Sequence, residues 1–340
     1  MANLEGIDVA PVSAWLEANI DGARGPFEFA FISGGRSNLT FAVTDADRRR
    51  LVLRRPPMSH VLATAHDMAR EHRIISALQG TAVPVPRTLG FCEDQSVNGR
   101  PFYVMDFVEG HVLRTPQLIE DHLDAAARTS AGHDLVDVLV EIHAVDPDAV
   151  GLGDLGRPQG YIERQLKRWY GQFQGSQQQM RDAGSGRPAP AVDEAHALLA
   201  ASVPEQTEVT IAHGDYRLDN TVVGGDGRIR AVLDWELCTL GDPLADLGTL
   251  LVYYSQPPGF PAAAELVERY REKSGRDTAN LDYYTAFGHW RLACIVEGVY
   301  ARYAAGAMGE DGKKGAEMFG SQTIHRAELA LKILKGTTKR

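Results

Sequence analysis

The spacing of apolar residues changes about a third of the way along this chain of 340 residues, and the change limits the folds that it can adopt. Residues 27–55 alternate apolar and polar side chains with turn-forming residues between the runs, which predicts an antiparallel meander of three strands. A run with apolar residues at threes and fours follows, and then two more strand-like runs around a polar loop. The expected strands and helix cover residues 28–32, 38–44, 51–54, 63–78, 87–91 and 101–105.

Beyond Gly110 the helical spacing dominates. We expect helices near residues 118–131, 135–143, 161–170, 192–201, 244–254, 262–273, 283–304 and 317–334. Residues 171–190 are rich in Gln, Gly and Pro and predict a surface loop. A sheet-rich part followed by a helix-rich part is typical of α+β architecture. We therefore expect two lobes, residues 1–105 with an antiparallel sheet plus helix, and residues 106–340 as a larger, mainly helical lobe.

Charge and composition exclude several classes of protein. The formal net charge of −10 is unfavourable for general binding of nucleic acid, which needs a basic surface. Cys92, Cys238 and Cys294 form no zinc spacing, and we interpret them as reduced, mostly buried thiols. The start of the chain lacks the pattern of a signal peptide, and the longest uncharged stretch, 247–264, is broken by a Pro-Pro-Gly turn. We expect a cytoplasmic protein that binds neither nucleic acid nor membranes.

The stretch His213-Gly214-Asp215-Tyr216-Arg217-Leu218-Asp219-Asn220 carries the strongest chemical signal. It follows a strand-like run, and a hairpin-like unit then leads to Asp234-Trp235-Glu236. Asp215, Asn220 and Asp234 thus lie at the ends of short strands. Phosphoryl transfer from ATP needs such a set: a carboxylate beside the attacking hydroxyl, and oxygen ligands that hold Mg²⁺ on the phosphates. The step from Asp215 to Asn220 equals that of the protein-kinase catalytic loop, with glycine in place of the usual arginine.

These residues, with Gly241-Asp242-Pro243-Leu244-Ala245-Asp246-Leu247, resemble the aminoglycoside phosphotransferase and choline kinase-like family of small-molecule kinases. The resemblance is to the branch related to the kinase-like domains of certain acyl-CoA dehydrogenases. It implies a bilobal protein-kinase-like fold and the use of ATP and Mg²⁺. It also implies that Asp215 orients or deprotonates the acceptor, that Asn220 and Asp234 hold Mg²⁺, and that Asp246 braces the loop. Arg217 stands where protein kinases carry a lysine near the γ-phosphate; a solvated surface arginine is the alternative.

The first third of the chain is then expected to bind the nucleotide. Gly34 and Gly35 fall in the turn that covers the phosphates in such kinases, and Ser37 and Asn38 are candidate hydrogen-bond donors there. On the third strand, Val52 and Arg54 share one face and Leu53 and Arg55 the other. If Val52 touches adenine, Arg54 points at the phosphates, although Arg55 is the competing candidate. Glu71 is the candidate partner of the arginine that binds the phosphates; a solvated helix glutamate is the alternative. The candidate adenine hinge consists of Met105, Asp106, Phe107 and Val108.

The function that we expect is transfer of the γ-phosphate of ATP to a hydroxyl group of a small molecule. A nucleotide-binding pseudokinase or scaffold is the rival. The resemblance favours a hydroxylated metabolite such as a hydroxyacyl compound over an aminoglycoside, which would need an acidic pocket. The acidic candidates are Glu297, Glu310, Asp311 and Glu317. On the acceptor side we expect Arg168, Trp169 and Tyr170, with the helix around residues 290–303.

One glycine-rich motif is better explained as a loop than as a dinucleotide-binding site. Residues 151–156 match the G-x-G-x-x-G pattern of dinucleotide-binding proteins. That fingerprint needs a buried strand before it and a helix directly after it, whereas Asp146-Pro147-Asp148 precedes it here and Arg157-Pro158 follows. We interpret the segment as a loop.

Overall fold

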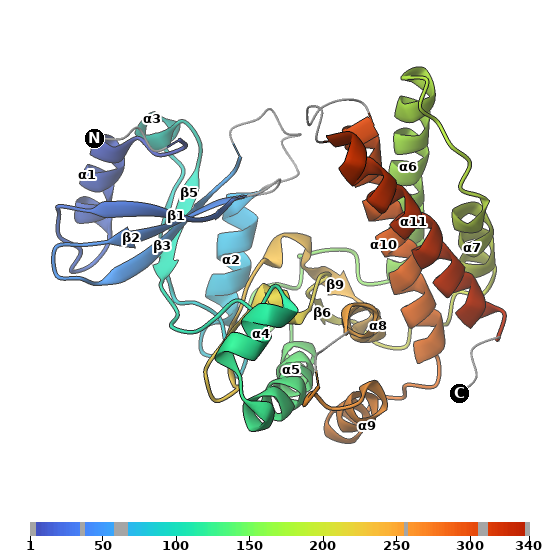
Figure 1. The fold of residues 1–340 in the computed structure, drawn as a ribbon. Coiled ribbons are helices and arrows are strands. Elements are labelled where there is room, and N and C mark those ends of the chain that lie inside the picture. The colour runs from blue at the N-terminus through green and yellow to red at the C-terminus, as the bar shows by residue number, and fades with distance from the viewer. Residues whose placement is uncertain (1–4, 35–37, 58–66, 255–257, 305–311, 337–340) are drawn as a thin grey trace.

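The computed structural model describes residues 5–34, 38–57, 67–254, 258–304 and 312–336. Its antiparallel sheet forms one end of the molecule and its helices form the other, so the expected bilobal α+β fold is confirmed (Figure 1). Within these ranges, every helix is too short or too polar to cross a membrane.

The N-terminal sheet has five antiparallel strands in the order β1-β2-β3-β5-β4. Their bounds are Glu28–Gly34, Leu39–Thr44, Arg50–Arg55, Thr88–Cys92 and Phe102–Asp106 for β1 to β5. The predicted meander is therefore β1-β2-β3, and the two later runs are β4 and β5. One short helix, α3 (Gln95–Asn98), was not expected in the loop between them; Asp94 caps it, and Gly99 ends it in the left-handed conformation.

The two faces of the sheet bury different partners because strand side chains alternate. Leu51 and Leu53 of β3 lie in an apolar cluster with helix α1 (Val9–Asn19). Val52 lies on the opposite face, in the larger cluster that includes helix α2 (Met68–Leu78) and the C-terminal lobe. The side chain of Asp67 accepts a hydrogen bond from the backbone N–H of Arg70 and caps α2. The face that carries Val52 and Arg54 is thus the one turned toward the rest of the molecule.

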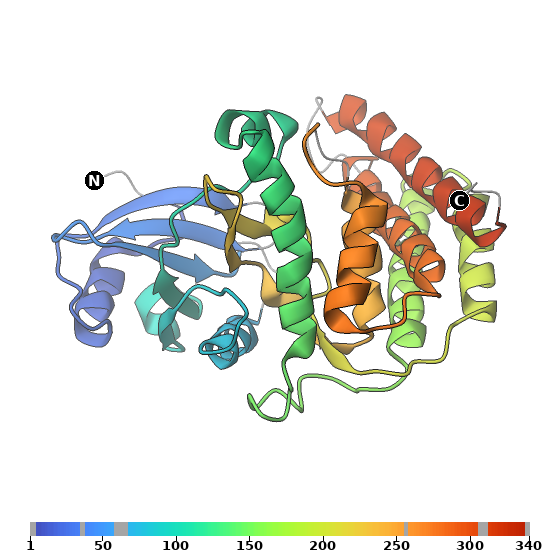
Figure 2. The same cartoon turned by 90° about the horizontal axis from the view of Figure 1, so that it is seen from below.

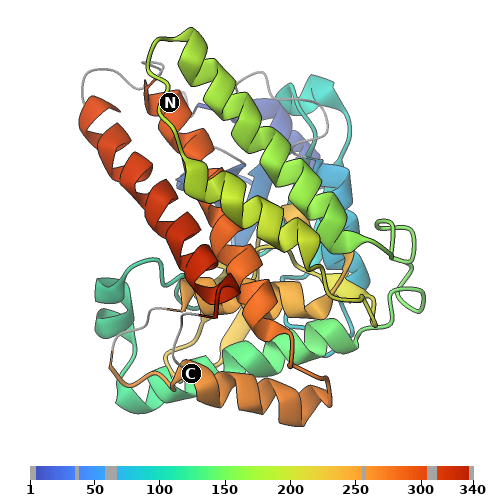
Figure 3. The same cartoon turned by 90° about the vertical axis from the view of Figure 1, so that its right-hand side faces the viewer.

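Helices build most of the C-terminal lobe. They are α4 (Pro116–His122), α5 (Ala125–Ala144), α6 (Tyr161–Asp182), α7 (Pro190–Ala201), α8 (Pro243–Tyr253), α9 (Ala263–Ser274), α10 (Leu281–Ala304) and α11 (Gly312–Leu334). Figure 2 shows α5 crossing the middle of the molecule, beside α9. Figure 3 shows α6, α7, α10 and α11 packed together, facing the viewer, at the end of the molecule opposite the sheet.

Three of the predicted helices, 118–131, 135–143 and 161–170, were wrong in their bounds. The break between α4 and α5 falls at Leu123, because the Asp124 side chain caps the N-terminus of α5, and Gly132 lies inside the helix against Pro261. Helix α6 continues to Asp182 through the segment predicted as a loop. Phe173, Gln177 and Met180 are buried there at helical spacing, and this packing outweighs the Gly and Gln content.

Four short strands and two 3-10 turns carry the motif. Strand β6 (Thr210–Ala212) pairs with β9 (Thr239–Gly241), and β7 (Thr221–Val223) pairs with β8 (Ile229–Val232). The turns are η1 (Leu218–Asn220) and η2 (Trp235–Leu237). The segment 151–156 lies in a loop after α5, with no strand before it, so its interpretation as a loop is confirmed.

Candidate functional site

A cavity of about 390 Å³ lies between the sheet and the C-terminal lobe. Its apolar lining includes Val52 of β3 and Val222 and Val232 of the β7-β8 hairpin. All four residues of the predicted hinge, Met105, Asp106, Phe107 and Val108, line it as well. Its polar lining includes Arg54, Glu71, Asn220 and Asp234. An apolar pocket with polar groups at one end suits a ligand with a flat base and an anionic tail.

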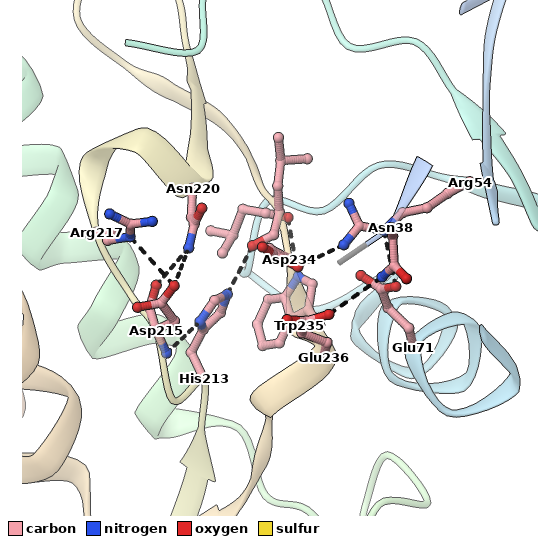
Figure 4. Close-up of polar contacts among 12 residues, drawn as sticks. Asn38, Arg54, Glu71, His213, Asp215, Arg217, Asn220, Asp234, Trp235 and Glu236 are labelled. Carbon is pink, nitrogen blue, oxygen red and sulfur yellow. Dashed lines mark hydrogen bonds and ion pairs between the residues drawn. The ribbon is translucent and has the colours of Figure 1, made fainter. Parts of the chain in front are cut away.

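The loop from His213 to Asn220 places its polar groups through a chain of hydrogen bonds (Figure 4). The backbone N–H of Asp215 donates to Nδ1 of His213 at 3.2 Å, and Nε2 of His213 donates to the Leu233 carbonyl at 3.0 Å. Nδ2 of Asn220 donates to both the carbonyl and Oδ2 of Asp215, at 2.9 and 3.0 Å. His213 therefore ties the loop to the strand that leads to Asp234, and Asn220 lies beside Asp215.

Asp234 lies on the same side of the cavity as Arg54. Its backbone is in the left-handed conformation (φ +66°), a conformation that costs energy for residues other than glycine and is common at functional sites. NH2 of Arg54 donates to its Oδ1 at 2.6 Å, and Nε of Arg54 donates to Oε2 of Glu71 at 3.1 Å. The structure thus brings together Arg54, Glu71 and Asp234 from three separate elements.

Electrostatics reinforces this ion-pair cluster. Burial raises the pKa of Glu71, whose side chain is only 1% exposed, and the Arg54 charge opposes that rise. Burial alone would lower the pKa of Arg54, but the carboxylates of Glu71 and Asp234 reverse this and leave it raised. Arg54 is therefore a fixed cation at the polar end of the cavity.

The competing candidate, Arg55, lies on the other face of the sheet. Its NH1 donates to the carbonyl of Gly6, and neither residue lines the cavity. Asn38 is buried, and its Nδ2 donates to Oε2 of Glu236 at 3.4 Å. Gly34 ends β1, while Gly35 and Ser37 lie outside the described residues, as does the rest of the predicted phosphate turn.

Glu236 is a polar residue of this region to which the sequence analysis gave no role. Burial raises its pKa to about 7, and the negative charge of Asp234 adds to the rise. It lines a second cavity of about 360 Å³, which shares Glu71 with the first cavity and also includes Arg168 of α6. Of the predicted acceptor residues, only Arg168 lines it; Trp169 is buried in the core and Tyr170 stacks on His196.

Arg217 turns back onto the loop instead of lying free at the surface. Its guanidinium pairs with Asp215 at 3.4 Å and with Asp219 at 2.8 Å, and it lies over the ring of Tyr253. Burial lowers its pKa, but the charges of Asp215 and Asp219 outweigh burial and leave the pKa raised. Arg217 thus keeps a positive charge beside Asp215.

Asp246 stabilises the start of the loop from His213 to Asn220. Its carboxylate is 1% exposed and accepts the backbone N–H groups of His213 at 2.6 Å and Gly214 at 2.8 Å. Burial alone would raise the pKa of Asp246, but these bonds and the contact with His143 outweigh it and lower the pKa. His143 was missed as part of this brace because its sequence position, on a helix with apolar neighbours, matches that of a packing residue.

Other residues of the cavity wall also escaped the sequence analysis. They are Thr40, His111, Arg114, His122 and Asp219 among others. The rings of His111 and His122 stack with centroids 3.7 Å apart. They come from the connection after β5 and from α4, segments in which the sequence shows no ligand spacing.

Two oxygen donors at the polar end of the cavity suit a divalent cation. Nδ2 of Asn220 is turned to Asp215, so its amide oxygen is the atom left to face a ligand, and Asp234 has one carboxylate oxygen beyond the Arg54 contact. Both are hard oxygen donors of the kind that Mg²⁺ prefers. Within the described ranges, no group of three or more His, Cys, Asp or Glu side chains forms a metal site. The residues therefore fit an ion that takes its other ligands from phosphates and water.

Comparisons with known proteins give the chain a family. The model of the phosphotransferase enzyme family matches residues 28–284. Acyl-CoA dehydrogenase family member 10 of Mus musculus is 34% identical over 326 residues, which cover 91% of this chain and 29% of the mouse protein. Family member 11 of Gallus gallus is 34% identical over 308 residues, 84% of this chain and 38% of the chicken protein. The chain thus spans less than half the length of these relatives.

Solved structures of similar fold support the same family. A Ralstonia eutropha protein assigned to the aminoglycoside phosphotransferases superposes with a TM-score of 0.79 at 32% identity, over 96% of this chain and 98% of that one. A spectinomycin phosphotransferase in complex with ADP and spectinomycin shares the fold, with a TM-score of 0.59 at 11% identity over 95% and 97% of the two chains. The predicted family and kinase-like fold are therefore confirmed: the chain belongs to the phosphotransferase enzyme family.

Proposed function

We propose that this chain transfers the γ-phosphate of ATP to a hydroxyl group of a small molecule, with Mg²⁺ as cofactor. The observation that carries the proposal is that Arg54, Asn220 and Asp234 line one cavity, where Arg54 binds Asp234 and Asn220 binds Asp215. In such transfers catalysis is mainly positioning and electrostatic stabilisation of the phosphates. The ADP held by the spectinomycin phosphotransferase, which shares the fold, supports nucleotide use.

Each residue has a role in this proposal. The adenine lies against Val52 and the segment 105–108, and the Arg54 guanidinium, held by Glu71, binds phosphate oxygens. Asn220 and Asp234 hold Mg²⁺, which neutralises the charge that develops on the phosphates. Asp215 orients or deprotonates the acceptor hydroxyl, and Arg217 stabilises negative charge beside it.

The lobe limits are part of the proposal. Residues 1–105 form the nucleotide-clamping lobe, with Gly34, Gly35, Ser37 and Asn38 at the phosphates, and residues 106–340 form the catalytic and acceptor-binding lobe. We place the acceptor hydroxyl beside Asp215, with Arg168, which lines the second cavity, on the acceptor side. The protein acts in the cytoplasm.

We favour a hydroxylated metabolite, such as a hydroxyacyl compound, over an aminoglycoside. An aminoglycoside is a polycation and needs an acidic pocket. Glu297, one of the four acidic candidates, is fully buried on α10 and paired with Arg187, so its charge is compensated. Glu310 and Asp311 lie outside the described residues, and Glu317 is exposed on α11. The similarity to acyl-CoA dehydrogenase family members 10 and 11 points in the same direction.

The test is ADP release by the purified chain with Mg-ATP and a panel of hydroxylated acyl compounds, sugars and aminoglycosides. We expect release above the acceptor-free rate with at least one hydroxylated metabolite. Asp215→Asn is expected to abolish it while ATP binding, measured by calorimetry, persists. ATP binding without turnover on any acceptor would favour a pseudokinase or scaffold, and full turnover by Asp215→Asn would refute the assignment of Asp215.

A further inference from the structure

A buried arginine from a distant helix reaches the catalytic loop. Arg291 of α10 is only 6% exposed, and its NH2 donates to the carbonyl of Gly214 at 2.5 Å. Its NH1 lies 3.5 Å from the hydroxyl of Thr249 on α8. Nothing in the sequence indicates this contact, because Arg291 lies 77 positions beyond Gly214 in an apolar helix.

The contact falls on the peptide unit that carries Asp215. A peptide is planar, so the Gly214 carbonyl and the Asp215 N–H turn together. Arg291 holds the carbonyl, and Nδ1 of His213 accepts the N–H at 3.2 Å. Both ends of this peptide are therefore bound by side chains instead of by a neighbouring strand.

The N–H group of the preceding peptide is bound by a side chain as well. The Gly214 N–H donates to Oδ1 of Asp246 at 2.8 Å, so one acidic and one basic side chain grip the two polar groups of Gly214. Gly214 has a φ of +83°, and a Cβ at this position would come 2.8 Å from the Leu237 carbonyl. The backbone conformation of Gly214 is thus restricted by Asp246, by Arg291 and by the Leu237 carbonyl.

We propose that Arg291 is a positioning residue, which sets the orientation of Asp215 through the Gly214 carbonyl. This inference rests on the proposed phosphotransfer, in which Asp215 must lie beside the acceptor hydroxyl. An error of about 1 Å in such a group can cost about a hundredfold in rate. A carbonyl that has lost its donor would be free to turn, and Asp215 would turn with it.

The other contacts of Arg291 connect the loop to the helices on the proposed acceptor side. Its guanidinium lies over the ring of Trp169 on α6, 5.2 Å from the centroid, and Arg168 lies over the same ring at 5.0 Å. Arg168 also lines the second cavity. Lysine has neither the planar fork nor the stacking face needed to make these contacts at once.

The experiment compares Arg291→Met and Arg291→Lys with the wild-type chain, and uses Arg326→Met as the matched control. Arg326 of α11 also donates to a backbone carbonyl, that of Val252 at 3.4 Å, but it makes no contact with the loop. Two kinds of measurement are made. The first is amide hydrogen exchange of residues 211–218 in the presence of Mg-ADP, and the second is kcat and the KM for ATP with an acceptor that the ADP-release panel identifies.

We expect Arg291→Met to speed exchange in residues 211–218 and to lower kcat by about a hundredfold, with the KM for ATP changed less than about twofold. Arg291→Lys should recover part of kcat, and Arg326→Met should leave both quantities near wild type. If Arg291→Met does not fold, Arg291→Lys alone decides, with an expected loss of kcat at constant KM.

Loop exchange and kcat equal to wild type in the Arg291 variants would overturn this inference and leave the proposed function intact. An equal loss in Arg326→Met would also overturn it, because the effect would then be one of general stability. Absence of turnover by the wild-type chain on every acceptor would overturn the proposed function as well. Since exchange needs no acceptor, the two failures are distinguishable.

Discussion

Arg54 and Glu71 form a buried ion pair, so the loss of Arg54 alone should destabilise the fold more than the loss of both residues. The side chain of Arg54 is 13% exposed and that of Glu71 only 1%, and the two lie 3.1 Å apart. Replacing Arg54 by Met removes the cation and leaves a buried carboxylate without compensation, which costs roughly 3–5 kcal/mol in the free energy of unfolding. Replacing Arg54 and Glu71 together by apolar residues removes the fully buried charge. Asp234 also loses Arg54, but its side chain is 29% exposed to water. Arg54→Met with Glu71→Leu should therefore recover most of that loss.

The assay is urea unfolding followed by tryptophan fluorescence and circular dichroism. Arg50→Met is the matched control on the same strand, because Arg50 pairs with Glu109 at the surface, with side chains 46% and 78% exposed. Such pairs contribute about 0–1 kcal/mol. A loss below about 1 kcal/mol in Arg54→Met, or a double variant as unstable as the single one, would refute the reasoning on the buried pair.

The pH dependence gives a second readout of the same variant. Without Arg54, the pKa of Glu71 in the folded protein should rise further above its value in the unfolded chain. The folded state then binds more protons than the unfolded state, so stability should increase as the pH falls. The deficit of Arg54→Met relative to wild type is therefore expected to be smaller at pH 6 than at pH 8, and a deficit that grows on acidification would contradict this sign.

Three further predictions concern other residues around the loop. Glu236 has a folded-state pKa of about 7 against an ordinary 4.5, so its contribution to stability should be full below pH 4.5 and lost as the pH rises through 7. Glu236→Gln should therefore flatten the dependence of the unfolding free energy on pH in this range by about 1–3 kcal/mol. An unchanged pH dependence would contradict this prediction. Asp246→Asn replaces an acceptor that binds two N–H groups and should destabilise by about 3 kcal/mol in urea unfolding, with turnover lost; near-wild-type stability would count against the brace. Gly214→Ala forces a Cβ toward the Leu237 carbonyl and should cost roughly 1–3 kcal/mol and most of the turnover, whereas an active, stable variant would show that the loop tolerates another backbone.

The sequence predicted well those features that depend on local pattern. The alternation in β3 placed Val52 and Arg54 on one face and Arg55 on the other, and the structure shows this arrangement. The family resemblance rested on three short motifs between His213 and Leu247, and the family match confirms it. The length of α6 was missed because the composition of residues 171–182 suggested a loop, whereas burial of Phe173 and Met180 decides the helix.

Contacts between distant segments could not be predicted in the same way. Arg54 meets Asp234 across 180 positions, and Arg291 meets Gly214 across 77. Neither pair has a periodic or spacing signal, because both form only when the lobes and helices pack. Arg54 became a candidate through its place on the third strand and the family resemblance, whereas Arg291, on an apolar helix, could be found only in the structure.

The central claim is that Asn220 and Asp234 hold a divalent cation on the phosphates of a nucleotide beside Asp215. The most direct test is a crystal structure of the chain with Mn²⁺ and a non-hydrolysable ATP analogue, in which anomalous scattering locates the ion. We expect the ion within coordination distance of the Asn220 amide oxygen and the Asp234 carboxylate, with the base against Val52 and the terminal phosphate facing Asp215. An ion bound elsewhere, or a nucleotide outside the cavity, would contradict the account.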